Sequence, residues 1–415
     1  MACELPAITM TLSRLSSPEA NLAAFGSIAF PLAMLIEAPI IMMLTAAAEL
    51  VRDRASLRDV RRYMMHFGGW LTVVHLMFTL TPLFGLVMQH LIAAPEVLYE
   101  PTRLAMLALT PWTWSIAYRR FYQGVLIRAG HSRIIGVGTG IRLLAGGAVL
   151  VFALMLPYFS GAVVGGVAAS LGVLAEALFI GYHARRITSR WGDNEIELES
   201  SKRGIPFRDF AVFYLPLVLT AILLFLIQPL GSVAMSRMRA PIDSLAVWPV
   251  VSSFLFIFRS FGTSFSEVVI TNYAPGTMAR DLRRFALLIA VCSSSLMLLL
   301  AASPLAPMVF ESLFQLRPEL RTLAQQALLL AAVTSALGAF ISFSQGVIVT
   351  ARRTALITKS VFVHLVVVAV LLWWAIQSLE IAGILAVVPA YAAGMFVQFL
   401  YLTRHADRIL SDTRA

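Results

Sequence analysis

Long apolar runs dominate the pattern of hydrophobic and polar positions along this chain. A buried helix of a soluble protein rarely needs more than about 14 consecutive apolar residues, whereas a helix that crosses a bilayer needs about 20. The pattern therefore predicts an all-α, multi-pass integral membrane protein. The runs of spanning length cover residues 22–50, 65–92, 103–124, 134–158, 160–183, 208–235, 243–272, 283–308, 321–350, 355–378 and 380–402.

A sequence repeat relates the two halves of the chain. The hexapeptide Arg-Asp-Val-Arg-Arg-Tyr at 58–63 returns as Arg-Asp-Leu-Arg-Arg-Phe at 280–285. Gln-Gly-Val-Leu at 123–126 returns as Gln-Gly-Val-Ile at 345–348, so both repeats have an offset of 222 residues. Duplicated bundles of membrane helices are typical of secondary transporters. We therefore expect two copies of one helical unit.

The repeat also predicts how the units divide the chain. The helix that opens the second half ends at Arg237, and the offset, with a slip of one residue, places this end opposite Arg14. We therefore expect two parallel six-helix bundles, with the first helix of the N-terminal bundle largely missing; the true start lies upstream, or the protein works with a stub. The expected parts are an N-terminal bundle over 1–187, a polar cytoplasmic linker over 188–207 and a C-terminal bundle over 208–415.

The net charge of +10 follows the topology. Arginines and lysines gather in alternate loops, and the positive-inside rule assigns those loops to the cytoplasm. We count Arg119 and Arg120 among these loop residues, and the C-terminus falls on the same side, so we expect a bacterial inner membrane location. The charges come in short bursts instead of forming one face, which argues against nucleic acid as a partner.

Ionisable residues at membrane depth are the candidate functional residues, because each costs about 2.5–3.5 kcal/mol on insertion scales. Glu37 and Arg259 occupy equivalent positions of the two halves. They could form a gated ion pair across a central cleft that a competing anion breaks. They could equally form a static salt bridge, and a register slip of one residue would pair Glu37 with Ser260 instead.

Other polar positions repeat with the same offset. It pairs a cation with a histidine and an acid with an amide on the fifth and sixth helices of each half. One more acid lies eight residues beyond Arg259, about two helical turns away on the same face. His75, with no polar mate, is interpreted as a packing residue. The candidate cavity set is Glu37, Arg259, Arg142, Glu176, His364, Gln398 and Glu267.

Scattered motifs add a family resemblance. They are Ala29-Phe30-Pro31-Leu32 running to Pro39, Pro111 ten positions before the segment 121–128, Trp248-Pro249-Val250, and Ser13-Arg14-Leu15 followed by 19–24. With the repeat, these features resemble the multidrug/oligosaccharidyl-lipid/polysaccharide (MOP) flippase superfamily. Within it, the chain is most similar to the progressive ankylosis family of anion exporters.

The resemblance implies two parallel six-helix bundles that face a central cleft and export pyrophosphate, nucleotides or citrate. Arg142 and Arg259 would suit such cargo, because guanidinium groups bind phosphate and carboxylate oxygens in pairs. We therefore expect a secondary transporter of organic or phosphorylated anions that works by alternating access, as a monomer in contact with membrane lipids.

Other functions stay open. A flippase for a lipid-linked saccharide or another amphiphile would share the fold and the cationic cavity. A cation-coupled multidrug exporter of the superfamily holds a key acid on the first helix, which is largely missing here. A membrane scaffold or enzyme is a further alternative, although the clustered His, Asp and Glu residues that an enzyme needs at one helix end are missing. We expect no catalytic residue, no cofactor and no metal; Cys3 and Cys292 have no metal-ligand spacing.

Overall fold

The computed structural model describes the chain from residue 4 to residue 412, except for 157, 190, 192–203, 264 and 273–278. Most of the predicted linker 188–207 therefore lies outside the described residues, as does Cys3.

The N-terminal half is a bundle of helices, several of which are interrupted. Residues 18–50 form one helical series that includes a wide, π-helical segment, η1. The elements are α1 (Glu4–Leu12), α2 (Pro18–Leu22), η1 (Ala23–Ala29), α3 (Phe30–Ile41), α4 (Met43–Leu50), α5 (Arg54–Leu80), α6 (Pro82–Leu86), η2 (Val87–Ile92), η3 (Glu96–Leu98), α7 (Tyr99–Arg128), α8 (Ser132–Met155) and α9 (Gly161–Thr188).

The C-terminal half repeats this plan with a long opening helix, α10, in the place that the nine-residue α1 holds in the first half. Its elements are α10 (Phe207–Arg237), α11 (Pro241–Thr263), α12 (Phe265–Asn272), α13 (Ala279–Ala302), α14 (Leu305–Phe314), α15 (Pro318–Ala331), α16 (Val333–Thr350), α17 (Ala355–Ser378) and α18 (Gly383–Asp412).

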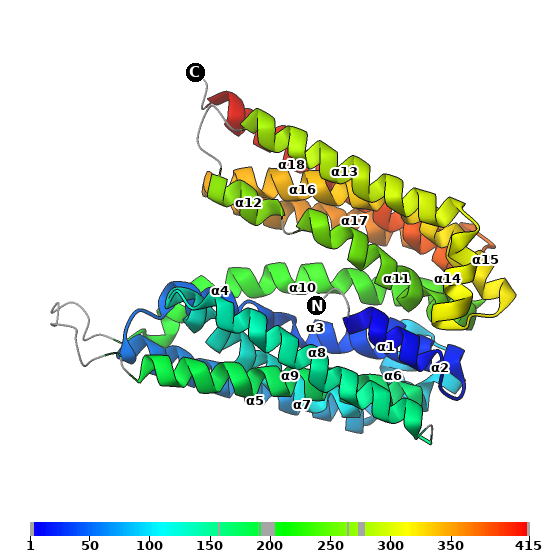
Figure 1. Ribbon diagram of the computed structural model, residues 1–415, viewed down its shortest axis with the longest axis horizontal. Coiled ribbons are helices and arrows are strands. Elements are labelled where there is room, and N and C mark those ends of the chain that lie inside the picture. The colour runs from blue at the N-terminus through cyan, green and yellow to red at the C-terminus, as the bar shows by residue number, and fades with distance from the viewer. Residues whose placement is uncertain are drawn as a thin grey trace.

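The predicted membrane architecture is confirmed. Within the described ranges, nine helices are long and apolar enough to cross a membrane, or ten if the bent pair α5 and α6–η2 is counted as one span. The helices run roughly along one common direction (Figure 1). Each predicted apolar run has a helical counterpart, and the run 103–124 corresponds to α7, a long helix with several charged residues.

Two predicted segments are not single straight helices. The run 65–92 bends by 68° between Leu80 and Pro82, and the run 283–308 ends its first helix at Ala302, just before Pro304. Proline cannot donate a backbone hydrogen bond, and it forces the preceding residue out of the helical conformation. Thr81, which precedes Pro82, is accordingly extended, with ψ of 167°.

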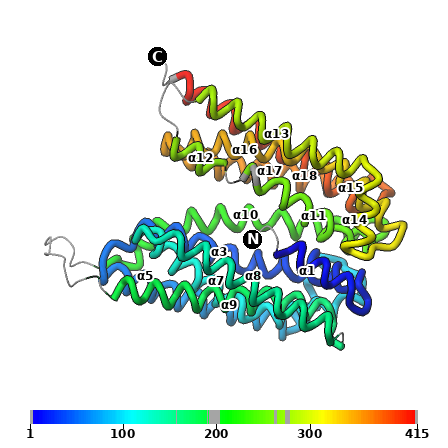
Figure 2. Tube along the Cα trace, viewed as in Figure 1, coloured from blue at the N-terminus to red at the C-terminus, as the bar shows by residue number. Residues whose placement is uncertain are grey.

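The two halves share a hydrophobic core, which includes α10 along its length, and a second core lies at one end of the C-terminal half. The main core cluster joins residues of α1 and η1 to Leu245, Val250 and Phe314 of the second half. A second cluster, around Phe265 and Leu402, contains residues of the C-terminal half alone. Figures 1 and 2 show the same arrangement, with the bundle of α12, α13, α16 and α18 diverging from the first half toward the end where α4 and the C-terminus lie.

Carbonyl groups freed by proline hold the joined end together. Pro31 and Pro249 cannot donate to Ser27 and Leu245, the residues four positions earlier, so these two carbonyls need other donors. The hydroxyl of Ser232 donates to the Ser27 carbonyl, and the hydroxyl of Ser27 donates to the Leu245 carbonyl at 2.5 Å. Both hydrogen bonds join the first half to the second.

Three arginines strengthen this junction at its outer edge. Arg14 donates to the carbonyl of Leu313 at 2.6 Å, and Arg237 donates to the carbonyl of His90 at 2.8 Å. Arg317 forms an ion pair with Glu19 across the two halves at 2.5 Å. All three come from the loops with few basic residues. The halves are therefore linked at this end. At the end with the basic loops, α10 still packs against the first half through Phe210 and Tyr214, whereas the bundle of α12, α13, α16 and α18 diverges (Figure 1).

Candidate functional site

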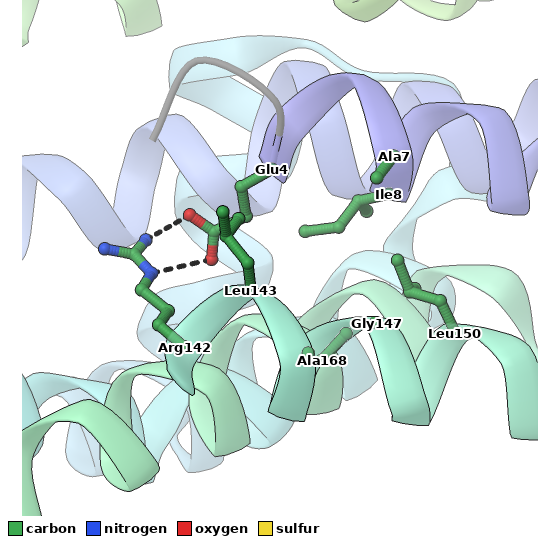
Figure 3. Close-up of a pocket in the computed structure, with 9 residues that line it drawn as sticks. Glu4, Ala7, Ile8, Arg142, Leu143, Gly147, Leu150 and Ala168 are labelled. Carbon is green, nitrogen blue, oxygen red and sulfur yellow. Dashed lines mark hydrogen bonds and ion pairs between the residues drawn. The ribbon is translucent and has the colours of Figure 1, made fainter. Parts of the chain in front are cut away.

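A buried network of charges occupies the N-terminal half. Glu176 of α9 is fully buried and accepts hydrogen bonds from Arg119 at 3.1 Å and from Gln123 at 3.0 Å, both on α7. Arg142 of α8 lies 3.8 Å from the same carboxylate and also forms a bidentate pair with Glu4 of α1, with its Nε 2.9 Å from Glu4 Oε1. Figure 3 shows Glu4 and Arg142 pointing toward each other from their two helices.

The network is nearly balanced in charge. The cations Arg119 and Arg142 face the carboxylates of Glu4 and Glu176, and each guanidinium has at least one short contact to a carboxylate. Buried ion pairs of this kind contribute little net stability, but removal of one partner typically costs about 3–5 kcal/mol because the other charge stays buried. The arrangement therefore fixes α1, α7, α8 and α9 relative to one another.

The assignment of Arg119 and Arg120 to a cytoplasmic loop is wrong. α7 continues to Arg128, and Arg119 is only 2% exposed. The burst of basic residues looked like a loop because Arg128 and Arg133 follow closely. Glu4 was missed as a site residue as well, since nothing in its local sequence indicates a partner 138 residues away.

Glu37 lies inside the N-terminal bundle and does not contact Arg259 in this conformation. Its side chain is fully buried and accepts a hydrogen bond from the hydroxyl of Thr113 at 2.8 Å. His75, also fully buried, places Nδ1 3.0 Å from the same hydroxyl and Nε2 3.0 Å from the carbonyl of Met106. His75 is thus part of a polar chain between α3, α5 and α7.

The three hydrogen bonds that link Glu37, Thr113, His75 and the Met106 carbonyl need one proton more than an ionised Glu37 and a neutral His75 supply. Thr113 has a single hydroxyl proton, and the Met106 carbonyl can only accept. If Thr113 donates to Glu37, both ring nitrogens of His75 must donate; if Thr113 donates to His75, the carboxyl group of Glu37 must donate to Thr113. Both arrangements satisfy the observed contacts, and they differ only in where that proton lies.

The second half contains the counterpart of the Arg142–Glu176 contact. His364 of α17 places Nδ1 2.8 Å from the amide oxygen of Gln398 on α18, and the amide nitrogen of Gln398 donates to Ser360 at 3.3 Å. The offset of 222 residues pairs Arg142 with His364 and Glu176 with Gln398, so each half brings its two paired positions into contact. The second half does this without a formal carboxylate.

Arg259 is a cation at membrane depth in the second half, and it has no carboxylate partner among the described residues. It lies on α11, and its Nε is buried without a hydrogen-bond partner. Across the described ranges, its guanidinium forms no ion pair. Arg120 of α7 has a similarly buried and unpartnered Nε in the first half. Arg119 Nε and Arg142 Nη1 are also buried without a hydrogen-bond partner, but their side chains contact carboxylates, whereas Arg120 and Arg259 form no ion pair with any residue that the structure describes.

Glu267 differs from the other candidates in its exposure. It lies on α12, beyond the end of α11 at Thr263, and its side chain is exposed. Residues 241–272 count as one membrane span, and that Glu267 shares a face with Arg259 stays a prediction.

The polar groups indicate binding chemistry. In the part of the chain that the structure describes, no three His, Cys, Asp or Glu side chains gather in a group that could hold a metal ion. The available groups are guanidinium donors, an imidazole and amides, which suit oxyanions.

Comparisons with known proteins identify the fold. No family model and no curated protein matches the chain. A solved structure described as the inward-facing conformation of a multidrug resistance MATE family transporter of the MOP superfamily is similar over 100% of this chain and 96% of its own, with 15% identity and a TM-score of 0.75. The lipid II flippase MurJ in an inward closed conformation covers 99% of this chain and 88% of its own, with 12% identity and a TM-score of 0.69.

The conformation of the matched structures is also informative. A structure described as the outward-facing conformation of a multidrug resistance MATE family transporter covers 98% of this chain and 96% of its own, with 15% identity and a TM-score of 0.61. This likeness is lower than that to the inward-facing structure. The predicted MOP-type fold is therefore confirmed.

Proposed function

We propose that this protein is a secondary transporter that moves organic or phosphorylated anions, such as pyrophosphate, nucleotides or citrate, by alternating access between its two halves. The observation that carries the proposal is Arg259, a cation on a membrane-spanning helix without a carboxylate partner among the described residues. A charged side chain at this depth is costly, so it usually faces a partner or a cavity.

An anionic substrate would supply the missing partner. Phosphate and carboxylate groups accept two parallel hydrogen bonds from one guanidinium group. Arg120 offers a second such group, and Arg142 already binds the carboxylate of Glu4 in this bidentate way. The cationic groups favour anions over the cationic drugs that a multidrug exporter would carry. The resemblance to the progressive ankylosis family supports the same substrate class.

The arrangement of the halves supports alternating access. At one end, serine hydroxyls donate hydrogen bonds to carbonyls that proline leaves free, and three arginines form further contacts between the halves. At the other end, the bundle of α12, α13, α16 and α18 diverges from the first half (Figure 1). Polar contacts of this kind can break and reform as rigid bundles rock. If the basic loops and the C-terminus are cytoplasmic, as the positive-inside rule predicts, this conformation is open to the cytoplasm.

The test is counterflow in liposomes that contain the purified protein. Radiolabelled pyrophosphate, citrate and ATP would each be offered to liposomes preloaded with the same unlabelled anion. We expect uptake of at least one anion, with at least a tenfold loss for Arg259→Ala. The control Arg283→Ala removes an exposed arginine that pairs with Asp407, and it should transport normally. Full uptake by Arg259→Ala would contradict the assigned role.

The second candidate function is a flippase for a lipid-linked saccharide or another amphiphile. It is favoured by the likeness to MurJ, which is described as a lipid II flippase. The same cation would then bind a lipid phosphate. Absence of uptake for all three soluble anions, together with movement of a labelled lipid-linked headgroup between leaflets, would favour this alternative.

A further inference from the structure

We propose that an exposed groove between α7 and α9, beside the start of α5, binds the headgroup of an anionic phospholipid. The groove has a volume of about 430 Å³ and is lined by Tyr118, Leu178, Tyr182, Arg185 and Arg186. It belongs to the first half and is made from side chains other than those of the buried charge network. The proposal does not depend on the transported substrate.

The floor of the groove orients one arginine. The guanidinium carbon of Arg185 lies 5.6 Å from the ring centre of Tyr118 and 5.9 Å from that of Tyr122. Arg185 Nε also donates to the hydroxyl of Tyr122 at 3.3 Å. Cation–π contacts of this kind fix the position of a guanidinium group without neutralising its charge. The terminal nitrogens of Arg185 thus keep their capacity to bind an oxyanion.

The groove is cationic. Arg186 is a second exposed arginine in its lining, and the charge of Arg61, on the second turn of α5, also acts on Tyr118. None of the lining residues is acidic, and these three arginines form no ion pair with any residue that the structure describes. By contrast, the exposed Arg283 and Arg284 have the carboxylates of Asp407 and Asp281 within 4 Å.

The position of the groove favours a lipid over a soluble anion. Leu171, Leu178 and Tyr182 are 44%, 60% and 62% exposed and lie seven and four residues apart, so they share one face of α9. This face leads from the middle of the helix to Arg185 in its last turn. Apolar side chains would contact an acyl chain, tyrosine suits the interface, and arginines at the helix end would reach the headgroup phosphate. Basic grooves between membrane helices bind anionic headgroups in this way.

The test is lipid retention by the purified protein, measured by native mass spectrometry with added phosphatidylglycerol, cardiolipin or phosphatidylcholine. We expect the wild type to retain the two anionic lipids and the Arg185→Ala/Arg186→Ala variant to bind them about thirtyfold more weakly, since each arginine near the surface contributes about a factor of five. The matched control Arg283→Ala/Arg284→Ala removes two adjacent exposed arginines that have carboxylate partners, and it should retain the lipids. Equal retention by both double variants would overturn the proposal.

A second variant and a competitor separate the remaining outcomes. Tyr122→Phe removes the hydroxyl that positions Arg185 and keeps both arginines, so it should weaken retention by a smaller factor than the double variant. A Tyr122→Phe variant that binds as tightly as the wild type would overturn the role given to this hydrogen bond. Inorganic phosphate at millimolar concentration should not displace the lipid; complete displacement would overturn the lipid assignment in favour of a free-anion site.

Discussion

Glu176 shows how one residue can organise a membrane bundle. Its buried carboxylate accepts hydrogen bonds from two residues of α7 and faces Arg142 on α8. Burial removes the water that would otherwise solvate these charges, so each one depends on the others. Gln398, which occupies the position equivalent to Glu176 in the second half, contacts His364 through a neutral amide. The two halves therefore use one geometry with different charge.

This dependence predicts the effect of removing a single charge. Glu176→Gln keeps the size of the side chain but leaves Arg119 without its carboxylate, which should destabilise the protein by about 3–5 kcal/mol. Thermal unfolding of the purified protein in detergent should therefore begin several degrees lower than in the wild type. The double variant Glu176→Gln/Arg119→Met should recover part of the loss. An unchanged melting curve for the single variant would show that the network is not a structural unit.

The sequence predicted some of these residues because the repeat reveals them. Arg142, Glu176, His364 and Gln398 are polar at equivalent positions of apolar helices, and the structure brings each pair together. Arg119 was missed because a basic cluster near a helix end has the same composition as a loop. The partners of Glu37 and Arg142 depend on contacts between distant helices, which local patterns do not specify.

At the scale of elements, the hydrophobic runs predicted the helices well but not their interruptions. Prolines end or bend the helices at Pro82 and Pro304, whereas Pro249 stays inside α11. Contacts between distant helices explain why α11 does not break at Pro249. The Leu245 carbonyl, which Pro249 leaves free, accepts a hydrogen bond from the hydroxyl of Ser27 in the other half. Proline alone therefore does not predict whether a membrane helix breaks.

The contact between η1 and α11 is close enough to be tested with one methyl group. A Cβ atom at Gly26 would lie 2.6 Å from the Cβ of Pro249, so Gly26→Ala should push the joined end apart at a cost of about 1–3 kcal/mol. Spin labels at Arg58→Cys and Arg280→Cys, in a chain with Cys3→Ser and Cys292→Ser, should then report a shift toward shorter distances. Gly69→Ala is the matched control, because no atom lies within 4 Å of its added methyl. An identical distance distribution for both alanine variants would contradict the closed packing of this end.

At the scale of the whole molecule, the distribution of apolar core explains the shape. One core joins the halves where the loops have few basic residues, and the second core of the C-terminal half stands apart at the opposite end. Well-packed bundles move as rigid bodies because their interiors are not continuously deformable. The parallel repeat in the sequence predicted two such bodies, but the end at which they separate is visible only in the structure.

The measurement that tests the account most directly is the distance between labels at positions 58 and 280 before and after addition of the transported anion. Both positions are exposed and lie near the starts of α5 and α13, beside the basic loops of the two halves. We expect the anion to shift the wild type toward shorter distances as the halves close on it, and Arg259→Ala to show no shift. An equal shift in Arg259→Ala, or none in the wild type, would contradict the claim that an anion bound at Arg259 drives the movement of the halves.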